Sequence, residues 1–188
     1  MGMLPGATEG NLTISMETNS RQLEKNQNSM RLNETETSEE YIPTFSADAL
    51  ITAASWGDTQ TIKRCLEGRA NVNYQDNNGG TALHNAARIR NTEIIELLID
   101  AGIDKNAQNK YGNTALHIAV MHGNTEIVTF LIDGGIDLNI KNEYGTTALH
   151  IAAKKDDQAI ATLLLDNDSD PNIRNKDVST SISTVVFS

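Results

Sequence analysis

A repeat with a period of 33 residues runs through most of this 188-residue chain. The tetrapeptide Thr-Ala-Leu-His occurs three times in register, beginning at Thr81, Thr114 and Thr147. A glycine stands two residues before each copy, at Gly79, Gly112 and Gly145. Counting back by one period from Leu83 reaches Leu50 in a degenerate first copy, and counting forward from Leu149 reaches Ile182. A fixed period of this length is typical of a solenoid, in which each unit is one small supersecondary element.

Each unit carries the signals of two short helices. Thr81 is a good N-cap for a helix that runs to about Ile89, because its hydroxyl can accept a hydrogen bond from a free N–H of the first turn. Asn91 or Thr92 then starts a second helix that ends near Ile99. Aromatic residues are only 4% of the chain, which favours cores of Leu, Ile and Ala between closely packed helices. The sequence therefore predicts an all-α fold of stacked helix-turn-helix units.

The repeated pattern resembles a known family. Gly-x-Thr-Ala-Leu-His-x-Ala-Ala, then Ile-Ile or Ile-Val, then Gly-x-Asp-x-Asn, is similar to the ankyrin repeat over about residues 41 to 182. This resemblance implies an ankyrin-repeat solenoid of antiparallel helix pairs with β-turn fingers at residues 76–80, 109–113 and 142–146. It also implies that the motif His bonds the adjacent repeat and the motif Thr, pairing Thr81 with His84, Thr114 with His117, and Thr147 with His150.

The register divides the chain into six segments. We expect a disordered polar leader over residues 1–40 and a truncated fifth repeat over 175–188. Between them lie a degenerate N-terminal capping repeat and three full repeats, over 41–75, 76–108, 109–141 and 142–174. Asp156 and Asp168 replace two glycines of the pattern in the fourth copy, which predicts looser loops there. Three full repeats are about the minimum for stability, because no unit can bury its apolar face alone.

The charge balance limits the classes of partner. The chain has 25 Asp and Glu against 15 Lys and Arg, a net charge of −10. Nucleic acids and anionic membranes are bound through basic surfaces, so we expect neither as a partner. No segment approaches the run of about 18 apolar residues that crosses a membrane, and the N-terminus has no secretory signal pattern. These features favour a cytoplasmic monomer.

The histidines and the single cysteine do not form a catalytic or metal-binding set. His84, His117 and His150 occupy one position in successive repeats, so they lie about one repeat apart, too far for one metal ion to bind them. Cys65 falls at a core position of the first copy's second helix. No phosphate loop, nucleophile elbow or carboxylate pair stands apart from the repeat pattern. We therefore expect no enzymatic activity, no metal and no cofactor.

Partner binding is expected at the less constrained positions of each unit. By resemblance, two positions at the end of each first helix and two in each finger face a concave surface. The candidates are Trp56, Arg88, Ile89, Lys110, Tyr111, Met121, His122, Tyr144, Lys154 and Lys155. One hypothesis is an apolar strip, ending in Lys154 and Lys155, that fits a protein segment with hydrophobic anchors and an acidic end. The alternative is that Trp56 packs under the leader and the lysines are only a solvated face.

Two classes of function remain open. The first is a non-catalytic protein-protein interaction module or adaptor that binds a partner protein on the helix and finger surface. The second is a fragment or accessory subunit of a larger enzyme or host-directed effector whose catalytic part lies elsewhere, because the array breaks off inside its fifth copy. The abundance of Asn, Ile and Lys fits an AT-rich genome and is compatible with a microbe that delivers ankyrin proteins into host cells. The sequence does not identify the partner.

Overall fold

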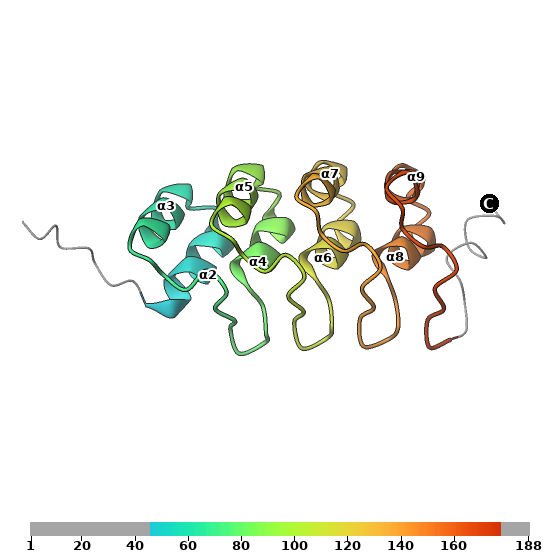
Figure 1. Ribbon diagram of the computed structural model, residues 1–188, viewed down its shortest axis with the longest axis horizontal. Helices are drawn as coiled ribbons and strands as arrows, with labels where there is room; N and C mark the ends of the chain where they lie inside the picture. The colour runs from blue at the N-terminus through green and yellow to red at the C-terminus, as the bar shows by residue number, and fades with distance from the viewer. Residues whose placement is uncertain (1–45, 178–188) are drawn as a thin grey trace, which may run out of the picture. The chain divides into compact units, whose positions relative to one another are not determined.

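The computed structural model describes residues 46–177 of the chain and contains eight α-helices in this range (Figure 1). In chain order they are α2 (Ala47–Trp56), α3 (Thr59–Glu67), α4 (Ala82–Ile89), α5 (Thr92–Asp100), α6 (Ala115–Met121), α7 (Thr125–Asp133), α8 (Ala148–Lys154) and α9 (Gln158–Asp166). The predicted leader, and residues 178–188 of the predicted fifth repeat, lie outside the described residues.

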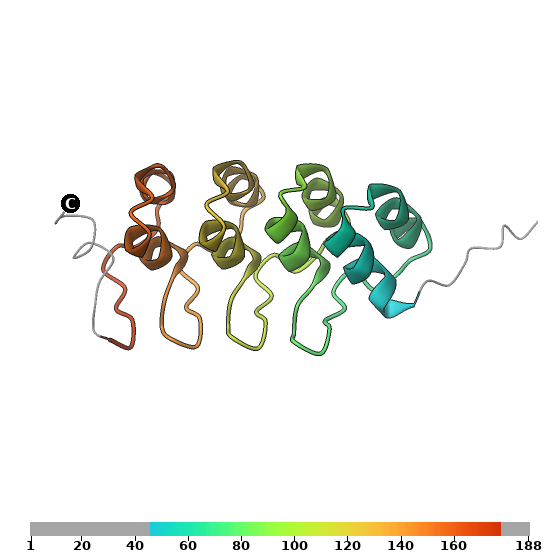
Figure 2. The same cartoon turned by 180° about the vertical axis from the view of Figure 1, so that it is seen from behind.

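The helices form two layers that stack unit upon unit (Figures 1 and 2). The inner layer contains α2, α4, α6 and α8, packed in that order, and the outer layer contains α3, α5, α7 and α9, packed likewise. The segment that leads from each outer helix to the next inner helix extends below the inner layer as a finger (Figure 1). This arrangement confirms the predicted solenoid of stacked helix-turn-helix units.

The core is a seam of aliphatic side chains between the two layers. Its fully buried large residues are all leucine or isoleucine: Leu50, Ile62, Leu83, Ile94, Ile95, Leu98, Leu116, Ile127, Leu131, Leu149, Ile160 and Leu164. Alanines of the inner helices, such as Ala86 and Ala119, are buried too, and their small side chains let neighbouring helices approach closely. Cys65 is buried among these residues, as its register position predicts.

Short polar side chains and left-handed residues set the helix ends. Asp58, Asn91 and Asp157 are N-caps whose side chains accept a hydrogen bond from the backbone N–H three residues on. In the fourth unit, Asp156 and Asp168 have φ of 55° and 67°, so they keep the left-handed backbone that glycine supplies in other units. That these loops are looser stays a prediction.

The fingers are joined edge to edge by backbone hydrogen bonds. Lys110 N donates to Asn78 O at 2.9 Å, and Glu143 N donates to Tyr111 O at 3.0 Å. Gly112 makes this approach possible, since a Cβ there would lie 2.7 Å from Glu143 N. Its φ of 71° also favours glycine. The tip of each finger is therefore held in a fixed relation to the next.

The motif histidines bridge each inner helix to the following finger. The Thr81 backbone N–H donates to Nδ1 of His84 at 3.1 Å, and the Thr81 hydroxyl lies 2.9 Å from the same atom. His84 Nε2 lies 2.9 Å from the carbonyl oxygen of Asn113 in the next unit. Because Nδ1 accepts the Thr81 N–H, Nε2 carries the proton that is donated to Asn113. The three Thr–His pairs implied by the resemblance are all present.

Candidate partner-binding face

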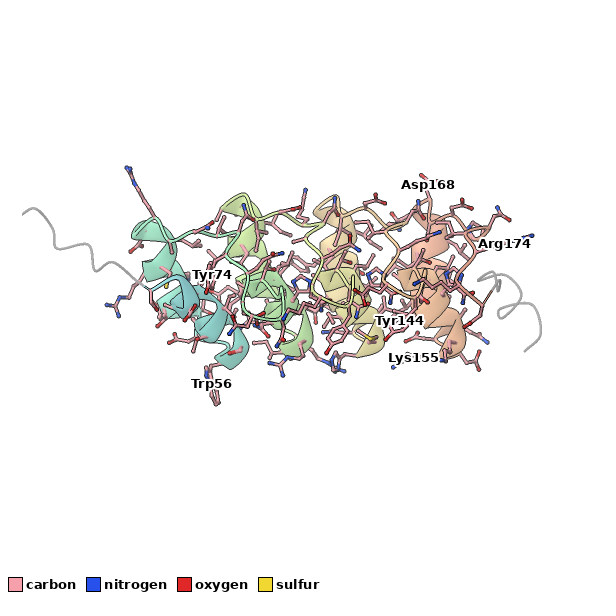
Figure 3. All side chains as sticks on the ribbon, turned by 90° about the horizontal axis from the view of Figure 1, so that it is seen from below. Trp56, Tyr74, Tyr144, Lys155, Asp168 and Arg174 are labelled. Atoms are coloured by element: carbon pink, nitrogen blue, oxygen red, sulfur yellow. The ribbon has the colours of Figure 1, made fainter. Side chains whose placement is uncertain are left out.

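The inner helices and the fingers together present one face, which we call the inner face. Seven of the ten predicted binding residues lie where the inner helices end: Trp56, Arg88, Ile89, Met121, His122, Lys154 and Lys155. Figure 3 shows Trp56 and Lys155 along the same long edge of the stack, with Asp168 on the opposite edge. The other three residues, Lys110, Tyr111 and Tyr144, lie in the fingers.

The inner face exposes large apolar side chains. Trp56 is 83% exposed, Tyr144 63%, Tyr111 56% and Met121 37%. Tryptophan, tyrosine and methionine are enriched in the cores of protein interfaces, where they supply a large buried apolar area. Repeated exposure of such residues along one face is the composition that a binding surface requires.

The structure brings four of the predicted residues together in one groove. Met121 of α6, Tyr144 of the third full repeat's finger, and Lys154 and Lys155 at the end of α8 line a cavity of about 670 Å³. Ile151, half-buried in the middle of α8, lies in the wall between them. We call this cavity the α6–α8 groove. It combines an apolar wall with two primary ammonium groups, and it is open to solvent.

A second hollow lies nearer the start of the stack. Trp56 and Ile89 line it together with Arg90, with a volume of about 550 Å³. Arg88, Lys110, Tyr111 and His122 are lining residues of neither hollow. The two hollows thus contain six of the ten candidates, and the continuous apolar strip stays a prediction.

Two cations brace the end of α6 from opposite sides. Lys155 Nζ donates to the carbonyl oxygen of Met121 at 2.7 Å, and Arg90 Nη2 donates to the carbonyl oxygen of His122 at 3.1 Å. The last carbonyls of a helix lack partners within the helix and carry partial negative charge, so cations stabilise them. These bonds tie the third unit's inner helix to the units before and after it.

The predicted set omitted several residues that line the face, among them Arg90, Ile151 and Asp177. Arg90 stands where other units have Gly57, Gly123 and Asp156, so the register marks it only as a departure. Ile151 stands at the variable position of the motif, where other units have Thr52, Asn85 and Ile118, so the register does not mark it as a binding residue. Asp177 lines the α6–α8 groove from the next finger, at the position that Tyr111 and Tyr144 hold in their fingers, so the register could have indicated it.

The described residues contain no cluster of three or more side chains that could hold a metal ion. Burial lowers the pKa of His84 below its usual value, while the hydrogen bond to Asn113 partly opposes this. Burial lowers the pKa of His117 in the same way, opposed by its bond to Thr146. Both imidazoles are engaged between units, so they hold the stack together rather than face a substrate.

Within residues 46–177 no helix is long and apolar enough to cross a membrane.

The fold is that of a helical repeat protein, because helix pairs joined by fingers stack in one row around a core of Leu and Ile. The chain belongs to the ankyrin repeat family. A family model described as three copies of the ankyrin repeat matches residues 91–175, and one described as many copies matches residues 50–99. No curated protein matches the chain. Ankyrin repeats are generally protein-protein interaction modules, so the family implies a protein partner.

Proposed function

We propose that this protein is a non-catalytic interaction module or adaptor that binds a partner protein on its inner face. The observation that carries the proposal is the α6–α8 groove, where exposed Met121 and Tyr144 adjoin Lys154 and Lys155. Apolar anchors beside charged groups are the usual composition of an interface core and its rim. The outer layer offers fewer such residues: among large apolar side chains it exposes Phe130 and Leu165.

The experiment compares apolar truncation on the two faces. One variant carries Met121→Ala and Tyr144→Ala in the α6–α8 groove, and the matched control carries Phe130→Ala and Leu165→Ala in the outer layer. The two variants and the unchanged protein each serve as bait in a separate crosslinking experiment. The partner is captured from the cells that produce the protein, or from host cells if there are any. Circular dichroism and melting establish that all three proteins are folded.

The proposal expects capture to be lost in the inner-face variant and kept in the outer-layer control. Loss is expected because a few buried aromatic and aliphatic anchors supply most of the binding energy of an interface. Capture that survives the inner-face substitutions, or that fails only in the outer-layer control, contradicts the proposal.

A further inference from the structure

In the three full repeats, charge is segregated between the two helix layers, whereas α2 of the inner layer carries Asp48 and α3 of the outer layer carries Lys63 and Arg64. The outer helices α5, α7 and α9 carry six carboxylates and no lysine or arginine: Glu93, Glu96, Asp100, Glu126, Asp133 and Asp166. The inner helices α4, α6 and α8 carry Arg88 and Lys154 and no carboxylate, and Arg90 and Lys155 follow directly at two of their ends. A chain with a net charge of −10 thus keeps a basic row on its inner face.

This basic row is not neutralised within the described part of the chain. The ion pair found between described residues joins Lys63 of α3 to Glu93 of α5, with Nζ and Oε1 2.9 Å apart, and it lies in the outer layer. Lys154 is exposed and makes no hydrogen bond or ion pair with residues 46–177. Lys155 uses one of its three donors on the Met121 carbonyl, which fixes its ammonium group at the groove.

The charged residues of the α6–α8 groove are distributed unevenly between its two sides. The two lysines lie on its α8 side, while Asp177 lies on the side of the following finger. Asp156 and Asp157 follow Lys155 in sequence, but neither lines the groove. Asp157 is the N-cap of α9 and accepts the Ile160 N–H. A carboxylate entering the groove is therefore attracted at its α8 side and repelled at its finger side.

We propose that the occupant of the α6–α8 groove is an acidic peptide segment of the partner protein. An apolar side chain of the segment packs on Met121, Tyr144 and Ile151, and a neighbouring carboxylate pairs with Lys154. This inference rests on the proposed function and names the chemistry of its partner. The acidic outer layer repels the same segment, so charge directs it to the inner face.

The probe is a phage-displayed library of short random peptides, selected against the full-length protein. Selected peptides are synthesised with their Asp and Glu, and again with Asn and Gln at the same positions. Their dissociation constants are measured by fluorescence anisotropy at low and at high salt. The proposal expects enrichment of Asp or Glu beside an apolar residue, and affinity that falls in the amide versions and at high salt.

The protein variant is Lys154→Glu, which removes no hydrogen bond or ion pair among the described residues. Its matched control is Arg174→Glu, which changes the net charge equally at a residue that does not line the groove. We expect Lys154→Glu to weaken binding of the acidic peptides by at least about threefold. Peptides that bear Lys in place of Glu should bind the Lys154→Glu variant more tightly than the acidic peptides do. Arg174→Glu should change affinity much less. Melting curves verify that both variants are folded.

The outcomes separate this inference from the proposed function. The proposal of an acidic occupant is contradicted if the selected peptides are neutral or basic. It is also contradicted if their affinity responds equally to Lys154→Glu and Arg174→Glu. If those peptides still lose affinity on Met121→Ala and Tyr144→Ala, binding at the inner face stands. If no selected peptide depends on either the lysine or the apolar residues, both the inference and the proposed function fail.

Discussion

Nε2 of His117 lies 3.0 Å from the carbonyl oxygen of Thr146, which belongs to the next unit of the stack. On the other side of the ring, Nδ1 accepts the Thr114 backbone N–H at 3.2 Å. A neutral imidazole with its proton on Nε2 makes both bonds, whereas protonation of Nδ1 destroys its acceptor. Cohesion between units is therefore linked to the charge of this side chain.

The stability of the array should fall as the solution becomes acidic below about pH 6.5, the usual histidine pKa. His84 and His117 have lowered pKa values in the folded chain, so the unfolded chain takes up protons first. Their stabilisation is complete above the unfolded pKa and is lost as pH falls toward the folded value. The slope approaches about 1.4 kcal/mol per pH unit for each group.

Urea unfolding between pH 7.5 and pH 5 measures this slope. The variant His84→Gln/His117→Gln is the comparison, because it removes both titrating groups. It should be less stable at neutral pH and show a flatter dependence on pH. An equal slope in both proteins would assign the acid sensitivity to other groups.

Replacing Gly112 by alanine should break the contact between neighbouring fingers. The new Cβ would meet Glu143 N at 2.7 Å and Asn142 Cα at 2.9 Å, in a backbone with φ of 71°. We expect a loss of about 2–4 kcal/mol in the free energy of unfolding. Gly102→Ala is the control, since its φ is 80° but nothing lies within 4 Å of the added atom. That variant should lose only about 1 kcal/mol.

The change Asn124→Asp should stabilise the third unit. Asn124 begins α7 without a side-chain capping bond, and its Nδ2 is buried with no partner among the described residues. The equivalent Asp58 and Asp157 cap α3 and α9. An aspartate oxygen can accept an N–H of the first turn and favours the positive end of the helix, which predicts a gain of about 0.5 kcal/mol.

Thermal unfolding tests this gain against Asn91→Asp. Asn91 already accepts the Ile94 N–H at 3.0 Å, so its replacement supplies no missing capping bond. The melting temperature should rise more for Asn124→Asp than for Asn91→Asp. A fall for Asn124→Asp would mean that the cost of burying the charge exceeds the benefit of the cap.

Truncation of one core leucine should destabilise the protein far more than truncation of an exposed one. Leu116 of α6 is fully buried in the middle of the stack, whereas Leu165 of α9 is 39% exposed. Leu116→Ala should cost about 2–5 kcal/mol, because it removes apolar contacts and leaves a cavity. Leu165→Ala should cost clearly less. Denaturant titration of both variants measures the difference, and similar losses would contradict the buried seam.

The sequence predicted those features that repeat with the period. The Thr–His pairs, the buried Cys65 and the exposure of Trp56, Tyr111, Met121 and Tyr144 follow from position within the unit. A side chain that differs from its counterparts in other units forms contacts that its position does not determine. Such contacts depend on neighbours brought together only by folding.

Arg90 illustrates this limit. Arg90 reaches the His122 carbonyl from a position held elsewhere by glycine or aspartate. Asp177 is the opposite case, because it lines the α6–α8 groove from the finger position that Tyr111 and Tyr144 hold in their own units. The register places the candidate residues on the inner helices and the fingers, whereas the hollows that some of them line form only when the units pack together.

The bonds between units also bear on how the chain reaches its folded state. They join residues that are about one repeat apart in sequence. The separations are 29 residues for His84 and Asn113, 29 for His117 and Thr146, and 34 for Lys155 and Met121. No early step needs to close a loop across the whole array, so the entropy cost of each step is small. Any two adjacent units can serve as a nucleus, and the remaining units add one at a time at its ends.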